Sequence, residues 1–156
     1  MNPVSVLLVE DNPADADLTR EAFEINRQDV ALSVVLDGVE AMDFLNKRGD
    51  FSEAAEPDLV LLDLNLPRKD GRQVLTEIKT SKALRKIPVV VMSSSKDQED
   101  IMRSYDLGAN CYISKPVDFK GFRDTMKSLN CFWFFTASLP DRRSGGHWGN
   151  ESGHVN

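Results

Sequence analysis

The 156-residue sequence lacks most of the features that mark membrane, secreted or nucleic-acid-binding proteins. It has no apolar run near the roughly 20 residues that a membrane-spanning helix needs, and its start, MNPVSVLLVEDNP, lacks the basic region of a signal peptide. Cys111 and Cys131 are too few for a disulfide framework, so we expect a cytoplasmic protein with reduced thiols. Lys and Arg number 19 against 25 Asp and Glu, and the resulting net charge of −6 argues against nucleic acid or membrane partners.

What the sequence does contain is a regular alternation of short apolar runs with amphipathic stretches. Five runs predict buried strands, at 4–9, 31–36, 59–62, 88–92 and 111–114. A helix is expected after each strand, the first of them reaching about residue 27. Strands that are hydrophobic on both sides occur in parallel sheets covered by helices on each face. The pattern therefore predicts an α/β, flavodoxin-like, doubly wound fold with a five-stranded parallel sheet.

The expected helices are recognised by their first residues and by their apolar faces. Asn12 is suited to cap the first helix, Pro13 fits its first position, and Asp15 and Asp17 favour the positive end of its dipole. The apolar face of the fourth helix is expected at Ile101, Met102 and Tyr105, and that of the last helix at Phe119, Phe122, Met126 and Leu129.

The chain divides into one folded domain and a polar tail. We expect the domain to span 1–139, with an aromatic-rich extension at about 131–139, and a tail without periodicity at 140–156. The extension contains four consecutive aromatic residues, which cannot all face one core because successive helical residues point about 100° apart. Either the chain leaves the helix and folds back, or part of the cluster is exposed at a protein interface. The cluster is Phe132, Trp133, Phe134 and Phe135.

Polar side chains stand where the predicted strands end, at the edge where doubly wound sheets bind ligands. Three converging carboxylates would repel one another unless a cation lies among them, and Mg²⁺ suits such oxygen ligands. Lys115 supplies a positive charge suited to phosphate, so the set predicts phosphoryl transfer onto the carboxylate of Asp63. The strand-end residues are Glu10, Asp11, Asp63, Ser93 and Lys115.

Four motifs at these strand ends, taken together, resemble the receiver domain of two-component response regulators. They are LLVEDNP, LVLLDLNLPRKDG, PVVVMSS and YISKP, and the resemblance covers roughly residues 4–132. It implies that Asp63 is the phosphoacceptor. It also implies that Mg²⁺, or Mn²⁺ in its place, is bound by Glu10, Asp11, Asp63 and the backbone carbonyl of Asn65.

The same resemblance assigns roles to three further positions. Ser93 matches the switch hydroxyl, and Tyr112 matches the aromatic switch residue whose ring turns inward when that hydroxyl moves to the phosphoryl group. Lys115 matches the lysine that binds the phosphoryl group, and in the family its bond to the following proline, here Pro116, is cis.

The long loop before Asp58, the DLNLPRKDG turn and the FWFFTASLP ending resemble single-domain regulators paired with phytochrome-type sensor kinases. This implies a separate sensor histidine kinase as phosphoryl donor and a homodimer built on residues 132–135. The two histidines, His147 and His154, lie in the predicted tail, which also favours a donor in another protein. The chain is then expected to be no enzyme, but a phosphoacceptor that takes part in its own phosphorylation and dephosphorylation.

Two other functions fit part of the pattern. A haloacid-dehalogenase-like phosphatase also uses a strand-end Asp with Mg²⁺, but it has a second acid two residues later, where this chain has Asn65. A phosphorylation-independent, dimeric interaction module would not need the complete set of acids, serine and lysine. Both functions stay open at this point, and phosphoryl uptake separates them from the receiver function.

Overall fold

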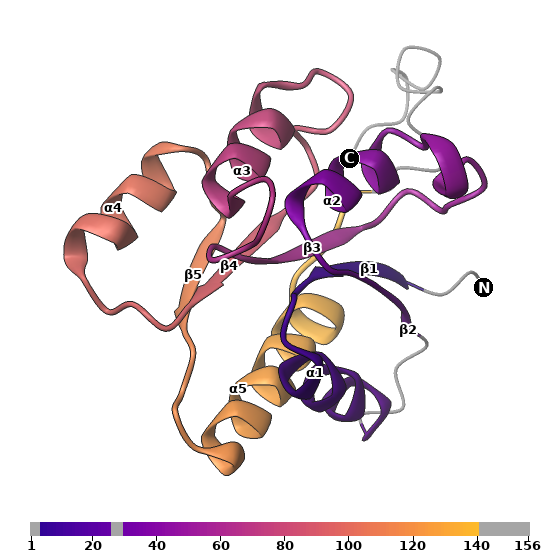
Figure 1. Ribbon diagram of the computed structural model, residues 1–156. Coiled ribbons are helices and arrows are strands. Elements are labelled where there is room, and N and C mark those ends of the chain that lie inside the picture. Colours follow the sequence, from indigo (N-terminus) through magenta and orange to yellow (C-terminus); the bar gives the residue numbers. More distant parts are fainter. Residues whose placement is uncertain (1–3, 26–29, 141–156) are drawn as a thin grey trace, which may run out of the picture.

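Five parallel strands form one sheet in the order β2-β1-β3-β4-β5 in a computed structural model that describes residues 4–25 and 30–140 (Figure 1). Helices α1 and α5 lie on one face of the sheet, and α2, α3 and α4 lie on the other (Figure 1). This arrangement confirms the predicted doubly wound fold. The strands are β1 (Val4–Val9), β2 (Val30–Val35), β3 (Leu59–Asp63), β4 (Val89–Ser93) and β5 (Cys111–Ser114). The helices are α1 (Pro13–Ile25), α2 (Gly38–Leu45), α3 (Gly71–Thr80), α4 (Gln98–Asp106) and α5 (Phe119–Cys131), with a 3₁₀ turn at Gly49–Phe51.

The core has two halves, one on each side of the sheet. Alternate residues of β1 point to opposite sides, so Leu7 and Val9 join the half under α2 and α3, while Val6 and Leu8 join the half under α1 and α5. All four side chains are fully buried. Burial on both faces explains why the strands read as continuous apolar runs rather than as alternating ones.

The start of α1 follows the prediction. The Asn12 side-chain carbonyl accepts hydrogen bonds from the N–H groups of Ala14 (2.9 Å) and Asp15 (3.2 Å), which would otherwise lack partners in the first turn. The predicted helix end near residue 27 lies outside the described residues. Since α1 begins directly after β1, its first turn lies at the carboxyl edge of the sheet, where the strand-end residues gather.

Two predicted apolar faces are wrong in part. In α4 the side chains of Met102 and Tyr105 are 63% and 48% exposed, and among its residues only Ser104 is buried. This helix packs over β5, which is an edge strand and offers less surface to cover. In α5 Phe119 is exposed, because it opens the helix after the β5–α5 loop, whereas Phe122, Met126 and Leu129 are buried as expected.

The aromatic extension continues the last helix instead of folding back. Residues Phe132–Thr136 form a π-helical turn directly after α5. Trp133 and Phe134 are half-buried against the α1–α5 half of the core, and the ring of Phe134 meets that of Phe23 edge to face at 6.0 Å. Phe132 is 52% exposed. Part of the cluster is therefore exposed, while the protein interface expected there stays a prediction.

The predicted tail lies outside the described residues from position 141 onward, so the domain boundaries stay a prediction. In the part of the chain that is described, no helix is long and apolar enough to cross a membrane.

Candidate functional site

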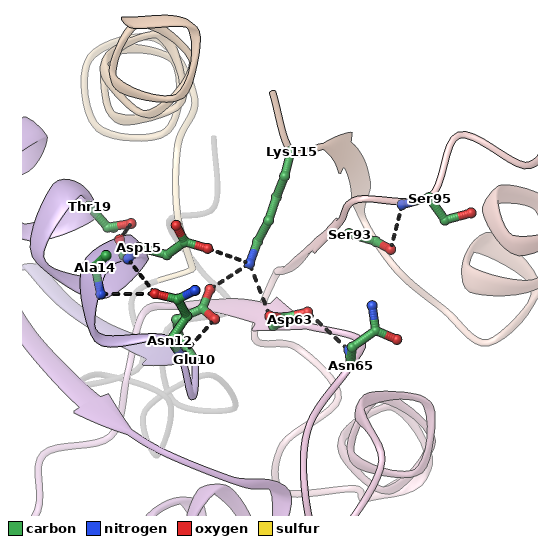
Figure 2. Close-up of polar contacts among 10 residues, drawn as sticks. All are labelled: Glu10, Asn12, Ala14, Asp15, Thr19, Asp63, Asn65, Ser93, Ser95 and Lys115. Atoms are coloured by element: carbon green, nitrogen blue, oxygen red, sulfur yellow. Dashed lines mark hydrogen bonds and ion pairs between the residues drawn. The ribbon is translucent and has the colours of Figure 1, made fainter. Parts of the chain in front are cut away.

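The ends of β1, β3 and β5 bring Glu10, Asp63 and Lys115 together at the carboxyl edge of the sheet (Figure 2). Glu10 follows β1, Asp63 ends β3 and Lys115 follows β5, so residues more than 100 positions apart meet in one place. The lysine backbone is fixed by its N–H group, which donates to the carbonyl oxygen of Ser93 at 2.7 Å. Its long side chain extends from the end of β5 to the acids at the ends of β1 and β3.

Three carboxylates surround the Lys115 ammonium group. Its Nζ atom lies 2.7 Å from Glu10 Oε1, 3.0 Å from Asp63 Oδ2 and 3.1 Å from Asp15 Oδ2 (Figure 2). An ammonium group has three N–H donors, and all three have a partner here. Glu10 is almost completely buried, whereas Asp15 keeps about a quarter of its side chain exposed.

Burial and neighbouring charges shift the pKa values of Glu10 and Lys115. Burial raises the pKa of Glu10 to about 7, although the hydrogen bond from Lys115 opposes the shift; the charge of Asp63 adds to it. Burial alone would lower the pKa of Lys115, but the hydrogen bond to Glu10 and the charge of Asp63 outweigh burial and raise it. The lysine is thus charged at neutral pH, and the raised pKa of Glu10 means that burial outweighs the single positive charge beside this acid.

A divalent cation bound beside these acids would add positive charge next to Glu10 and Asp63. Carboxylate oxygens of Glu10, Asp11 and Asp63 lie within 4.8 Å of one another, which is compatible with binding to a single ion. Asp11 is exposed at the edge of this group, and the other two acids are buried. Hard oxygen ligands with one solvent-facing side suit Mg²⁺, which keeps several of its waters when it binds proteins. The acids therefore fit the ion expected from the sequence.

The two predicted switch residues are linked through Ser95. The N–H group of Ser95 donates to Ser93 Oγ at 3.1 Å, and its carbonyl oxygen accepts from the Tyr112 hydroxyl at 2.9 Å. Its own hydroxyl donates to Asp100 Oδ2 at 2.7 Å. A movement of the Ser93 hydroxyl would thus break its hydrogen bond with Ser95 and so could shift the β4–α4 loop and the half-buried Tyr112 ring.

Asn65 lies beside the predicted phosphoacceptor, whereas the peptide bond before Pro116 differs from the expected one. The Asn65 N–H group donates to Asp63 Oδ1 at 3.0 Å and holds that carboxylate in place, while the metal-ligand role of the Asn65 carbonyl stays a prediction. The expected cis bond between Lys115 and Pro116 is not found: within the described residues every peptide bond is trans. Lys115 reaches its three partners with this trans bond, which is the intrinsically preferred form even before proline.

Asp15 and Ser95 are site residues that the sequence analysis did not identify. Asp15 was interpreted through the helix dipole and as part of an acidic helix face that could dock the kinase, yet its place in the first turn after β1 puts it at the carboxyl edge, and that position was the available signal. Ser95 lies in a polar loop and gives no such signal, because its contacts depend on Asp100 and Tyr112 from other elements.

Known proteins share both this fold and this sequence pattern. Residues 6–127 match the response regulator receiver domain family. Response regulator Rcp1 of Synechocystis sp. is 42% identical over 138 residues, which cover 88% of this chain and 94% of that protein. The crystal structure of the phosphorylated cyanobacterial phytochrome response regulator RcpA is 46% identical, with a TM-score of 0.86, and the match covers 88% of this chain and 99% of that one. The Mn²⁺-bound form of Rcp1 has the same TM-score at 42% identity, covering 88% and 99% of the two chains.

Proposed function

The chain belongs to the response regulator receiver domain family, and from this premise we propose that Asp63 accepts a phosphoryl group from a sensor histidine kinase in an Mg²⁺-dependent reaction. The observation that carries the assignment is the meeting of Lys115 with Asp63 beside two further acids. A phosphoryl group in transfer spreads negative charge over its oxygens, and Lys115 together with a cation bound by the acids would neutralise that charge beside Asp63.

In the proposed reaction an oxygen of the ionised Asp63 carboxylate attacks the phosphorus atom. The bond from phosphorus to the donor nitrogen of a phosphohistidine breaks, its electron pair stays on that nitrogen, and an acyl phosphate forms on Asp63. Asn65 N–H orients the carboxylate from one side, and Lys115 contacts its other oxygen and stabilises the charge on the transferred group. Ser93 and Tyr112 would then carry the change to the surface through Ser95.

Four groups would hold the Mg²⁺ ion: the carboxylates of Glu10, Asp11 and Asp63 and the backbone carbonyl of Asn65. When bound, the ion neutralises charge on the phosphoryl oxygens and on the acids around them. Mn²⁺ is an alternative that the same oxygen ligands accept, and the Mn²⁺-bound form of Rcp1 supports this choice.

The donor kinase is proposed to be of the phytochrome type. RcpA is a phytochrome response regulator, and its match to this chain extends over almost its whole length. A cytoplasmic location, where such a kinase domain would meet the chain, likewise stays a prediction; the described cysteines, Cys111 and Cys131, are both free thiols.

The test of this function is Mg²⁺-dependent uptake of one phosphoryl group. The full chain is incubated with a small acyl phosphate and Mg²⁺, and its intact mass is followed over time. We expect a gain of one phosphoryl group that disappears when EDTA removes the metal. Steady release of phosphate from unrelated esters would favour a phosphatase instead. If neither the small donor nor a histidine kinase produces a gain in mass, the result would favour the phosphorylation-independent interaction module.

We also propose a homodimer built on the end of α5 and residues 132–135. An apolar groove of about 390 Å³ lies between β5 and this segment, and the exposed ring of Phe132 stands at its border. A groove and an exposed aromatic side chain next to each other can complement a second copy across a two-fold axis. The groove is lined by Cys111, Ile113, Asp124, Thr125, Ser128, Leu129, Phe132 and Trp133.

Replacing Phe132 by Glu is expected to convert the dimer to a monomer in analytical ultracentrifugation, because a charge would be buried without a partner. Leu36→Glu is the matched control, since Leu36 is 55% exposed and follows β2 at the other edge of the sheet. The control should sediment like the wild type. A wild-type monomer, or a Phe132→Glu variant that still dimerises, would contradict the proposed interface.

A further inference from the structure

The contact between Asp15 and Lys115 involves neither the phosphoacceptor nor the acids that fit a metal ion. Asp15 Oδ2 reaches the lysine Nζ atom at 3.1 Å from the first turn of α1 (Figure 2). Its backbone is fixed on both sides, because its N–H group donates to Asn12 Oδ1 and its carbonyl accepts from Thr19 Oγ1 at 2.9 Å. The backbone that carries this carboxylate is therefore held by hydrogen bonds within the first turns of α1.

The three carboxylates around Lys115 are not equivalent. Glu10 and Asp63 belong to the group of acids that can share a metal ion, and Asp15 does not. A divalent cation in that group would compete with the ammonium for Glu10 and Asp63 and would also repel it. Asp15 is then the partner whose attraction for the lysine is least reduced when the site is loaded.

We propose that Asp15 is a positioning residue that holds the Lys115 ammonium beside Asp63 while the phosphoryl group is transferred. The proposal rests on the function assigned above to Asp63. Asp15 acts through the lysine: it occupies one of the three N–H donors, and this orients the remaining donors toward the oxygens carried by Asp63. No bond is made or broken at Asp15 itself.

The first measurement is the initial rate of phosphoryl uptake by full-length variants from a small acyl phosphate at saturating Mg²⁺. Asp15→Asn is expected to be about three- to tenfold slower than the wild type, the effect of weakening one charge-assisted hydrogen bond at a partly exposed place. Asp15→Glu should recover part of the rate. Asp17→Asn is the matched control, because it removes the same charge from an exposed position of the same helix and should leave the rate unchanged.

The second measurement reports on the lysine itself. Acetylation of Lys115 by acetic anhydride, mapped by peptide mass with the exposed Lys120 as reference, should be faster in Asp15→Asn than in the wild type when Mg²⁺ is present.

The outcomes separate the positioning role from the function on which it rests. A wild type that takes up phosphoryl groups while Asp15→Asn matches it in rate and in labelling would overturn the role of Asp15 alone. A slow Asp15→Asn variant with unchanged Lys115 labelling would overturn it as well, since the defect would not pass through the lysine. A wild type without uptake would overturn the role of Asp63, and the positioning role with it.

Discussion

Asp63→Asn leaves the chain without measurable phosphoryl uptake, a loss of at least about 10³-fold in rate, from a small acyl phosphate or from a histidine kinase. The amide has nearly the shape of the carboxylate, and its one oxygen can accept the hydrogen bond of either Lys115 or Asn65 N–H, but it has no ionised oxygen to attack phosphorus. The fold should persist, because the substitution removes one of several like charges that crowd this edge of the sheet. Intact mass after incubation with donor and Mg²⁺ is the measurement.

The control for this experiment is Asp17→Asn, which changes the same group at an exposed place on α1 and should gain one phosphoryl group like the wild type. Peptide mapping of the wild-type product should locate the added group on the segment that contains Asp63. A phosphorylated Asp63→Asn chain, or a product mapped to Glu10 or Asp11, would assign the acceptor to another carboxylate and contradict the proposed mechanism.

The strand-end residues were predictable because their positions follow from sheet topology alone. The carboxyl ends of parallel strands lie on one edge, so an acid after 4–9, an acid at the end of 59–63 and a lysine after 111–114 must gather there once the strands are recognised. Recognition was easy because both faces of the sheet are buried, which makes the apolar runs continuous.

Features that depend on which neighbour lies opposite were not predictable in the same way. Met102 and Tyr105 have helical spacing, but spacing alone does not say whether the facing strand is central or at an edge. The role of Asp15 required knowing that a lysine 100 positions later reaches the first turn of α1. Ser95 joins Ser93, Asp100 and Tyr112, and such a contact network leaves no periodic trace in a sequence.

Gly71 is a further position whose importance the sequence understated, since Asp70-Gly71 reads simply as a turn before a helix. A Cβ atom at Gly71 would lie 2.5 Å from the carbonyl oxygen of Asp63 and 2.6 Å from the Cα atom of Leu64. Both neighbours are backbone atoms, which cannot move aside as a flexible side chain can. The Gly71 N–H group also donates to the Leu64 carbonyl at 3.1 Å, so the start of α3 is docked directly onto the end of β3.

Gly71→Ala is therefore expected to lower the free energy of unfolding by about 2 kcal/mol, within the range for overpacked interiors. The sign is informative, because alanine favours a helix over glycine by about 1 kcal/mol and would stabilise α3 if space allowed. Urea unfolding measures the change, and Thr76→Ala, at an exposed position of the same helix, should stay within about 0.5 kcal/mol of the wild type. A Gly71→Ala chain as stable as the wild type would show that α3 and β3 can separate without cost.

The same substitution should slow phosphoryl uptake more than a loss of stability explains. Relief of the clash requires β3 and α3 to move apart, and the backbone that would shift is that of Asp63 itself. A displacement of about 1 Å at a reacting group can cost on the order of a hundredfold in rate, so we expect at least a tenfold loss in Gly71→Ala. The rate is measured where the variant is fully folded, so the unfolded fraction does not contribute. A normal rate in a destabilised Gly71→Ala chain would mean that the clash displaces α3 and leaves the backbone of β3 in place. The position of Asp63 would then depend on the sheet alone.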